Sequence, residues 1–216
     1  MPSKAKKRCN NKKAASADAA TAAADPRPGE RSVTFFWKSA SPFSQWHEST
    51  YTLVINDVPY QYNCAEQGMM HGKALLFGDL EVAAQILAVV SPREMKALGR
   101  MVRGFDDLTW KQYRQEIVYR NSVAKFTQNR YLCEALLNTM DDYLVEASPF
   151  DKIWGIGVKE ADARKMCHEK WPGLNLLGRI LTRVRDEIQQ GVHPTAFLGD
   201  SDKTSNGRRG VAHLAI

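Results

Sequence analysis

The spacing of hydrophobic positions changes along the chain and predicts where strands and helices lie. Residues 33–37 and 51–55 are short runs rich in β-branched and aromatic residues, which favour strands. The Asn-Asp-Val-Pro sequence at 56–59 then favours a turn. Beyond Asn63, apolar residues recur every three or four positions, so the chain up to residue 137 is predicted to be mostly helical. A strand over 143–147 and a last helix after Pro172-Gly173 complete the pattern.

Capping residues predict where several helices begin. Asn63 is suited to cap a helix that ends near Gly78, and Asp79 to cap one that continues to about Val90. The Ser-Pro-Arg-Glu sequence at 91–94 has the form of a capping box, with proline at the first helical position. Together the elements predict an α+β fold: a mostly helical single domain with a small β-sheet.

We place the folded domain at residues 32–191. Residues 1–31 combine a lysine-rich cluster with an alanine-rich stretch and offer little bulky apolar surface, so we expect this basic tail to be disordered. Residues 192–216 are rich in Gly, Ser and Asp and have no clear periodicity. They are expected to form a flexible C-terminal tail.

The charge of the chain is concentrated in its tails. The net charge is +6, yet residues 1–31 carry eight Lys/Arg against three Asp/Glu, and residues 32–191 carry 19 of each sign. A neutral domain is not built to bind nucleic acid, because phosphate neutralisation dominates such binding. The tail still predicts a weak attraction to nucleic acid. Its lysine cluster is either a nuclear-import signal or a solvated tail without an address, so we expect a cytoplasmic or nuclear protein.

Several function classes lack the motifs they need. No apolar run reaches the ~20 residues of a membrane span, so no membrane association is expected. The four cysteines are widely spaced and form no zinc-binding pattern, so no metal is expected. The sequence contains no dinucleotide-binding or P-loop glycine motif and no Gly-x-Ser-x-Gly. We therefore expect no cofactor, and no pattern predicts an oligomeric state.

One predicted helix carries two charged residues on an apolar face. Positions 62, 65, 66, 69, 70, 73, 76 and 77 fall on one side, and this side includes Glu66 and Lys73 among apolar residues. The two lie about 10 Å apart along a helix, which is too far for a direct pair. One interpretation is that the face lines a polar cleft and that Lys73 has a lowered pKa. The alternative is that Lys73 reaches the surface while Glu66 bonds to a loop amide.

Two further segments carry candidate ligand-binding residues. The strand over 143–147 leads into a loop with Asp151, Trp154, Gly155 and Gly157, where an indole face and close backbone amides favour a ligand. The alternative is an ordinary glycine turn beside a buried tryptophan. Asn175 lies near a helix N-terminus, which favours either an anion such as a diphosphate or an ordinary N-cap.

These segments, in this order, resemble the NADAR family, also called YbiA-like. The resemblance covers about residues 34–188, and it is carried by short matches along that length. They are Pro-Phe-Ser-Gln-Trp (42–46), Ala-Glu-Gln and Gly-Lys-Ala (65–74), Leu-Gly-Arg (98–100), Trp110, Lys-Phe (125–126), Val-Glu-Ala-Ser with Asp-x-x-Trp-Gly-x-Gly (145–157), and Gly-x-Asn-x-Leu-Gly with Val-Arg (173–185). Each match is weak alone, but the ordered set is specific.

The resemblance implies a YbiA-like fold and a metal-independent N-glycoside hydrolase. Its matching functional positions are Glu66, Lys73, Trp110, Asp151, Trp154 and Asn175. Further substrate-binding candidates are Ser44, Gln45, Trp46, Gln67, Gly155 and Gly157. Gln45 stands where many members have Asn, and Gln67 where bacterial members often have His. These two departures bear on the choice of substrate.

We interpret the protein as an enzyme that removes ADP-ribose from ADP-ribosylated guanine in DNA, RNA or a nucleotide. Glu66 and Asp151 would then be the catalytic carboxylates. Lys73 would either form a Schiff base with ring-opened ribose or hold a phosphate. One alternative is hydrolysis of the phosphoribosyl-aminopyrimidine intermediates of riboflavin biosynthesis, a ribosylated small-molecule substrate. Another is a non-catalytic module that binds ADP-ribose or NAD.

Overall fold

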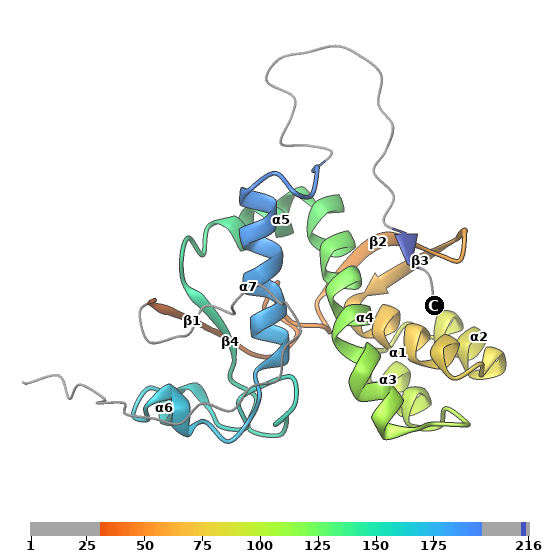
Figure 1. Cartoon of the computed structure of the whole chain (residues 1–216), viewed down its shortest axis with the longest axis horizontal. Coiled ribbons are helices and arrows are strands. Elements are labelled where there is room, and N and C mark those ends of the chain that lie inside the picture. Colours follow the sequence, from red (N-terminus) through yellow and green to blue (C-terminus); the bar gives the residue numbers. More distant parts are fainter. Residues whose placement is uncertain (1–30, 196–212, 215–216) are drawn as a thin grey trace, which may run out of the picture.

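The computed structural model describes residues 31–195 and 213–214 (Figure 1). The strands are β1 (Val33–Phe36), β2 (Glu48–Ile55), β3 (Val58–Cys64), β4 (Tyr143–Glu146) and β5 (His213–Leu214). The helices are α1 (Ala65–Leu76), α2 (Leu80–Ala88), α3 (Pro92–Arg100), α4 (Asp107–Gln128), α5 (Arg130–Leu137), α6 (Glu160–Ala163) and α7 (Leu176–Gln189), with a short 3₁₀ helix, η1 (His168–Lys170). The expected disorder of 1–31 lies outside the described residues except at Arg31, and the expected flexibility of 192–216 lies outside them except at 192–195 and 213–214.

The predicted fold class is confirmed, but the strands form two small sheets. β1 pairs in parallel with β4, which sets Phe36 opposite Glu146. β2 pairs with β3 antiparallel and with β5 in parallel. β2 and β3 are joined by Asn56 and Asp57, both with positive φ, as a two-residue hairpin turn requires.

β3 was not predicted from the sequence. Pro59 lies near its start, and proline is an unfavourable residue within a sheet. It is tolerated here because β3 is an edge strand of its sheet. As a result, α1 begins only after Cys64, one residue later than a helix capped by Asn63 would. Asp79 caps α2 as predicted, by accepting a hydrogen bond from the Val82 amide.

The long helix α4 organises the packing around it. It contacts α1 and β2 on one side and α7 on the other, while α7 covers β4 (Figure 1). Glycines bring α1 close to α4: a Cβ on Gly68 would lie 1.8 Å from the Asn121 Oδ1, and one on Gly72 would lie 2.9 Å from Ile117. This close contact fixes where α1 begins, and its first turn carries Glu66.

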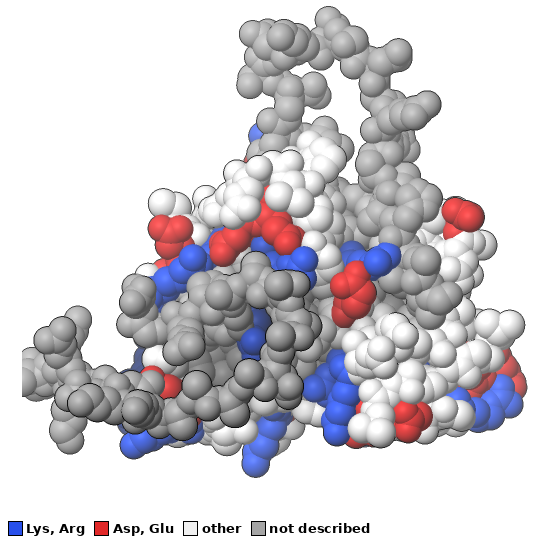
Figure 2. All heavy atoms as spheres, viewed as in Figure 1, with Lys and Arg blue, Asp and Glu red and all other residues white. Residues whose placement is uncertain are grey.

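The distribution of charge on the surface agrees with the equal numbers of basic and acidic residues in 32–191. On the face drawn in Figure 2, basic and acidic side chains are interspersed. Many of them form exposed ion pairs one helical turn apart, such as Lys111 with Asp107 and Arg130 with Glu134. Within the described part of the chain, no helix is both long and apolar enough to cross a membrane.

Candidate active site

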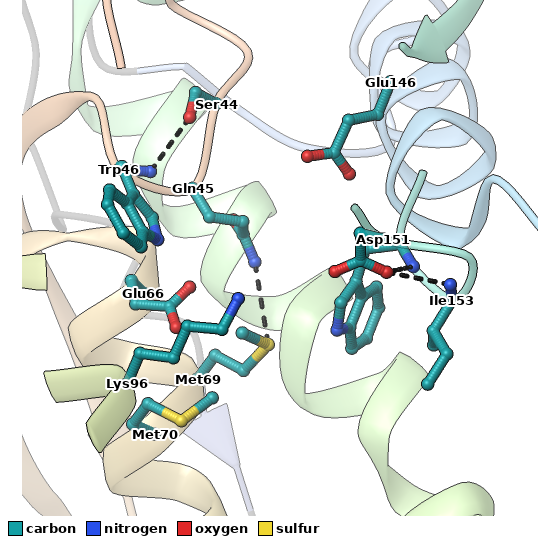
Figure 3. Close-up of a pocket in the computed structure, with 11 residues that line it drawn as sticks. Ser44, Gln45, Trp46, Glu66, Met69, Met70, Lys96, Glu146, Asp151 and Ile153 are labelled. Atoms are coloured by element: carbon teal, nitrogen blue, oxygen red, sulfur yellow. Dashed lines mark hydrogen bonds between the residues drawn. The ribbon is translucent and has the colours of Figure 1, made fainter. Parts of the chain in front are cut away.

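A pocket of about 180 Å³ brings together four parts of the chain that are separated in sequence. Figure 3 shows Glu66 on one side of this pocket and Glu146 and Asp151 on the other. Its lining consists of Ser44, Gln45, Trp46, Glu66, Met69, Met70, Lys96, Glu146, Asp151, Ile153 and Trp154. Six of these are residues predicted from the sequence: Ser44, Gln45, Trp46, Glu66, Asp151 and Trp154. Glu146 and Lys96 were not predicted.

Glu66 presents a buried carboxyl group to the pocket. Only 3% of the residue is exposed, and its Oε1 has no hydrogen-bond partner among the described residues. Its backbone amide donates to the Gln45 carbonyl at 2.9 Å, which joins the start of α1 to the pocket loop. Burial raises the pKa of Glu66 to about 7, although the positive charge of Lys96 opposes this rise.

Glu146, a half-buried residue at the end of β4, presents a second carboxyl group to the pocket. Its Oε2 also has no hydrogen-bond partner among the described residues. Burial, together with the negative charges of Asp151 and Glu66, raises its pKa to about 8. One sequence signal could have identified it, because Glu146 is a lone acid that ends an otherwise buried apolar strand.

Asp151 is held by the loop that follows β4. Its Oδ1 accepts hydrogen bonds from the Ile153 and Trp154 amides, both at 2.8 Å. Gly155 lets this loop pack against β4, since a Cβ there would lie 2.7 Å from the Glu146 carbonyl oxygen. Gly157 has a φ of 74°, which favours glycine. Neither glycine lines the pocket, so both act on the shape of the loop.

Asn175 fastens β4 in place. Its Nδ2 donates to the Leu144 carbonyl and its Oδ1 accepts from the Glu146 amide, both at 2.9 Å. It occupies the N-cap position of α7 with a φ of 53° but makes no capping hydrogen bond with its side chain. Asn175 therefore positions Glu146 from behind the strand and lies outside the pocket lining. A direct role in substrate binding stays a prediction.

Gln67 is also directed away from the pocket. Its Oε1 accepts from the Asn63 amide, and its Nε2 donates to the carbonyls of Ile86 and Val89 at 3.0 and 3.1 Å. The side chain thereby ties the start of α1 to the end of α2. Its neighbour Glu66 is the one that faces the pocket.

Lys73 and Trp110 form a separate group beside the pocket. The Lys73 Nζ donates to the Gly99 carbonyl at 2.7 Å and lies 4.2 Å from the Phe105 ring centre and 5.7 Å from that of Trp110. Burial lowers the pKa of Lys73, in the predicted direction. Neither Lys73 nor Trp110 is part of the pocket lining. The two turns of helix that separate Lys73 from Glu66 place their side-chain ends apart.

The buried Lys125 holds the loop that supplies Ser44, Gln45 and Trp46. Its Nζ donates to the carbonyls of Pro42 and Ser44 at 2.8 and 2.9 Å. Burial lowers the pKa of Lys125 to about 7. Because Gln45 in turn accepts from the Glu66 amide, this lysine supports one whole side of the pocket.

We expect Lys125→Met to misplace this side of the pocket. The change leaves the part-buried Pro42 carbonyl without its lysine donor and the Ser44 carbonyl with only the His47 amide, at a cost of about 1–3 kcal/mol. It should lower the melting temperature and reduce kcat/KM about tenfold or more. Lys111→Met is the control, because Lys111 lies on the same helix with an exposed side chain. Melting curves and steady-state kinetics of both variants test this, and equal kinetics for the two would contradict the positioning role.

The pocket carboxyl groups do not form a recognisable metal cage. Within 31–195 and 213–214, no group of three or more His, Cys, Asp or Glu side chains is placed to hold a metal ion. The groups in the pocket lining that can take part in chemistry or binding include its acids, Lys96 and the indoles of Trp46 and Trp154.

Comparison with known proteins agrees with this fold. The family model described as "NADAR domain" matches residues 35–189. The chain is 42% identical over 149 residues to "N-glycosidase R617" of Acanthamoeba polyphaga mimivirus, covering 68% of this chain and 88% of that protein. It is 34% identical over 126 residues to the chloroplastic "Riboflavin biosynthesis protein PYRR" of Zea mays, covering 56% of this chain and 18% of that protein.

A solved structure shares the fold. The NMR structure of the E. coli protein YbiA matches with a TM-score of 0.60 and 21% sequence identity, covering 74% of this chain and 87% of YbiA. The protein therefore has a YbiA-like fold, a mostly helical domain with two small sheets. The chain belongs to the NADAR family. It is an N-glycosidase of that family, as the sequence predicted.

Proposed function

We propose that this N-glycosidase removes ADP-ribose from ADP-ribosylated guanine by hydrolysing the bond between ribose C1 and a nitrogen of the base. One observation carries the reaction chemistry: Glu66 and Glu146 face one pocket, and each has a buried carboxyl oxygen without a hydrogen-bond partner among the described residues. Glycoside hydrolysis uses two carboxyl groups, one protonated and one ionised, on either side of the bond that breaks.

The raised pKa values assign the roles. Glu146, with a pKa of about 8, keeps its proton at neutral pH and donates it to the departing base nitrogen. Glu66, with a pKa of about 7, is partly ionised there and accepts a proton from the water that attacks C1. Asp151 adds a negative charge that stabilises the positive charge developing on the ribose. The net reaction adds one water, with the hydroxyl on C1 and the hydrogen on the base.

The dimensions of the pocket indicate which part of the substrate it holds. Its volume of about 180 Å³ is below the about 300–1,000 Å³ of typical ligand sites. We infer that the ribose and its bond to nitrogen enter, while the base remains near the mouth. Trp46 and Trp154 line the pocket, and Trp46 is 37% exposed, so an indole face is available for stacking on the base.

Lys73 is proposed to contribute a positive charge near the substrate and not to act as a nucleophile. An imine with ring-opened ribose would require its Nζ to leave the Gly99 carbonyl and reach past the pocket wall. We expect Lys73→Arg, which keeps the charge, to retain activity within about tenfold of wild type. Borohydride added during turnover should leave no ribose on the peptide that contains Lys73. A trapped adduct, together with loss of activity in Lys73→Arg, would show that this lysine is the nucleophile.

A second candidate substrate is favoured by one comparison. The matched maize protein is named for riboflavin biosynthesis. The phosphoribosyl-aminopyrimidine intermediates of that pathway also carry a base nitrogen on ribose C1. Glu66 and Glu146 would act on the bond between ribose C1 and nitrogen in the same way. The choice between the two substrates therefore depends on contacts that other residues make with the base or the phosphate.

The test is a direct assay of base release. The protein is incubated with an ADP-ribosylated guanine oligonucleotide and, separately, with the aminopyrimidine ribotide, and the products are followed by mass spectrometry. We expect release of guanine-containing oligonucleotide and free ADP-ribose. Cleavage of the ribotide alone would establish the second candidate. If neither is cleaved while ADP-ribose binds, the protein is a reader of ADP-ribose.

A further inference from the structure

We propose that Lys96 and Arg100 of α3 bind the phosphate on C5 of the substrate ribose, so that the enzyme selects ribosides that carry this phosphate. The inference rests on the proposed function and names the class of substrate more closely. Both ADP-ribosylated bases and phosphoribosyl-aminopyrimidines belong to this class, whereas ordinary ribonucleosides do not.

The first support is the close contact of α3 with the pocket wall. Gly99 of α3 packs against Met70 of α1, and a Cβ on this glycine would lie 2.0 Å from the Met70 Sδ. Met70 itself lines the pocket. The absence of a side chain at Gly99 therefore brings the last turns of α3 against the residues that surround Glu66.

The second support is the direction of the two cations. Lys96 and Arg100 are four residues apart on α3, so they lie on the same side of the helix. Lys96 lines the pocket, and Figure 3 shows its amine pointing inward near Glu66. The charges of both Lys96 and Arg100 reach the Glu66 carboxyl group and lower its pKa against the effect of burial. Lys96 is thus at the place assigned to the ribose, and Arg100, an exposed residue outside the pocket lining, lies one helical turn further along α3.

The third support is that neither of these two cations is held in an ion pair. Within the described residues neither Lys96 nor Arg100 forms an ion pair, and the printed ring contact of Lys96 is with Trp46, 6.0 Å from its Nζ. The next arginine, Arg103, is by contrast paired with Asp79 at 2.5 Å and with Glu81 at 3.0 Å. A lysine and an arginine that are not held in ion pairs beside a small pocket are suited to a phosphate, which forms strong charge-assisted hydrogen bonds.

The positions of the pocket carboxyl groups explain why the phosphate would lie beside α3. The ribose C1 must lie between Glu66 and Glu146 for the bond to nitrogen to break. Its C5 substituent then leaves from the other end of the sugar ring. A phosphate is repelled by the side of the pocket that carries Asp151 and attracted to the α3 side. The cations thereby orient the sugar as well as hold it.

The binding test uses ribose 5-phosphate and ribose as probes, so it does not depend on turnover. We expect ribose 5-phosphate to raise the melting temperature of the wild-type protein and ribose to leave it unchanged. Arg100→Gln should lose most of this rise. The control is Arg93→Gln, an exposed residue at the other end of α3, about 10 Å away along the helix. No rise in the wild-type protein, or equal rises in both variants, would overturn the phosphate site.

A kinetic test separates the phosphate site from the proposed function. Guanine ribosylated on the same nitrogen, with and without the C5 phosphate, is offered to the wild-type protein and to Arg100→Gln. We expect a KM about tenfold higher or more in the variant for the phosphorylated substrate alone, with kcat nearly unchanged. An equal loss on both substrates would mean that Arg100 only tunes Glu66. A melting-temperature rise without any base release would keep the phosphate site and refute the proposed function.

Discussion

Glu66→Gln is expected to lower kcat by about 10²–10⁴-fold in a protein that stays folded. Glutamine has the shape of glutamate, but it cannot accept the proton of the attacking water or stabilise positive charge on the ribose. The wild-type rate should rise with pH through about 7, as Glu66 ionises, and this rise should be absent in the variant. Glu48→Gln is the control, because Glu48 is an exposed glutamate at the start of β2.

The same substitution should stabilise the protein at alkaline pH. The folded state keeps the Glu66 proton up to about pH 7, whereas the unfolded chain loses it near 4.5. Between these values the folded state binds more protons, so the free energy of unfolding falls as pH rises. Removing this group should therefore add on the order of 2–3 kcal/mol at pH 8, and almost nothing near pH 4.

Melting curves at several pH values check this expectation. A gain of that size corresponds to about 5–10 °C in melting temperature for a domain of this length. A variant that is inactive and less stable at every pH would mean that the glutamine misfolds the pocket. A variant that turns over within about threefold of wild type would remove Glu66 from the chemistry.

The site residues that could be predicted from the sequence are those that interrupt a regular local pattern of apolar and polar residues. Glu66 is an acid on an apolar helix face, and such a group must either be paired or face a cleft. Asp151 and Trp154 lie in a glycine-containing loop after a strand, which favours a ligand. Both expectations agree with where the pocket lies. The confirmed fold class follows from such periodicities, which are clearest in α7, where buried apolar residues recur every three or four positions.

Other parts of the site depend on contacts between distant residues. Lys96 is a lysine on a polar helix face, and only the contact of Gly99 with Met70 places it at the pocket. Glu146 faces the pocket because β4 pairs with β1, far away in sequence. Other polar residues were expected from the sequence to bind a ligand but do not line the pocket. Gln67 and Asn175 look like ligand-binding groups, yet their side chains are used to fasten backbone segments.

Glu146→Gln is the second large effect that we expect, and it tests the acid that the sequence did not reveal. Without a proton donor the base must leave as an anion, so kcat should fall by about 10²–10⁴-fold for a substrate with a poor leaving group. A substrate whose base leaves without protonation should be cleaved almost as fast as by the wild-type protein. Glu94→Gln, an exposed glutamate in the first turn of α3, provides the matched control.

The pH dependence identifies Glu146 as the acid and separates it from Glu66. The acid must be protonated to act, so the wild-type rate should fall as pH rises through about 8, the pKa of Glu146. In Glu146→Gln this fall should disappear, because the group that loses its proton is no longer present. Rates measured from about pH 5 to 10 with poor and good leaving groups provide the test. If Glu146→Gln keeps the wild-type rate and its alkaline fall, the proton comes from another group, and Asp151 becomes the partner of Glu66. If the variant loses both the wild-type rate and the alkaline fall, and does so only for the poor leaving group, protonation of the base is the step that Glu146 performs.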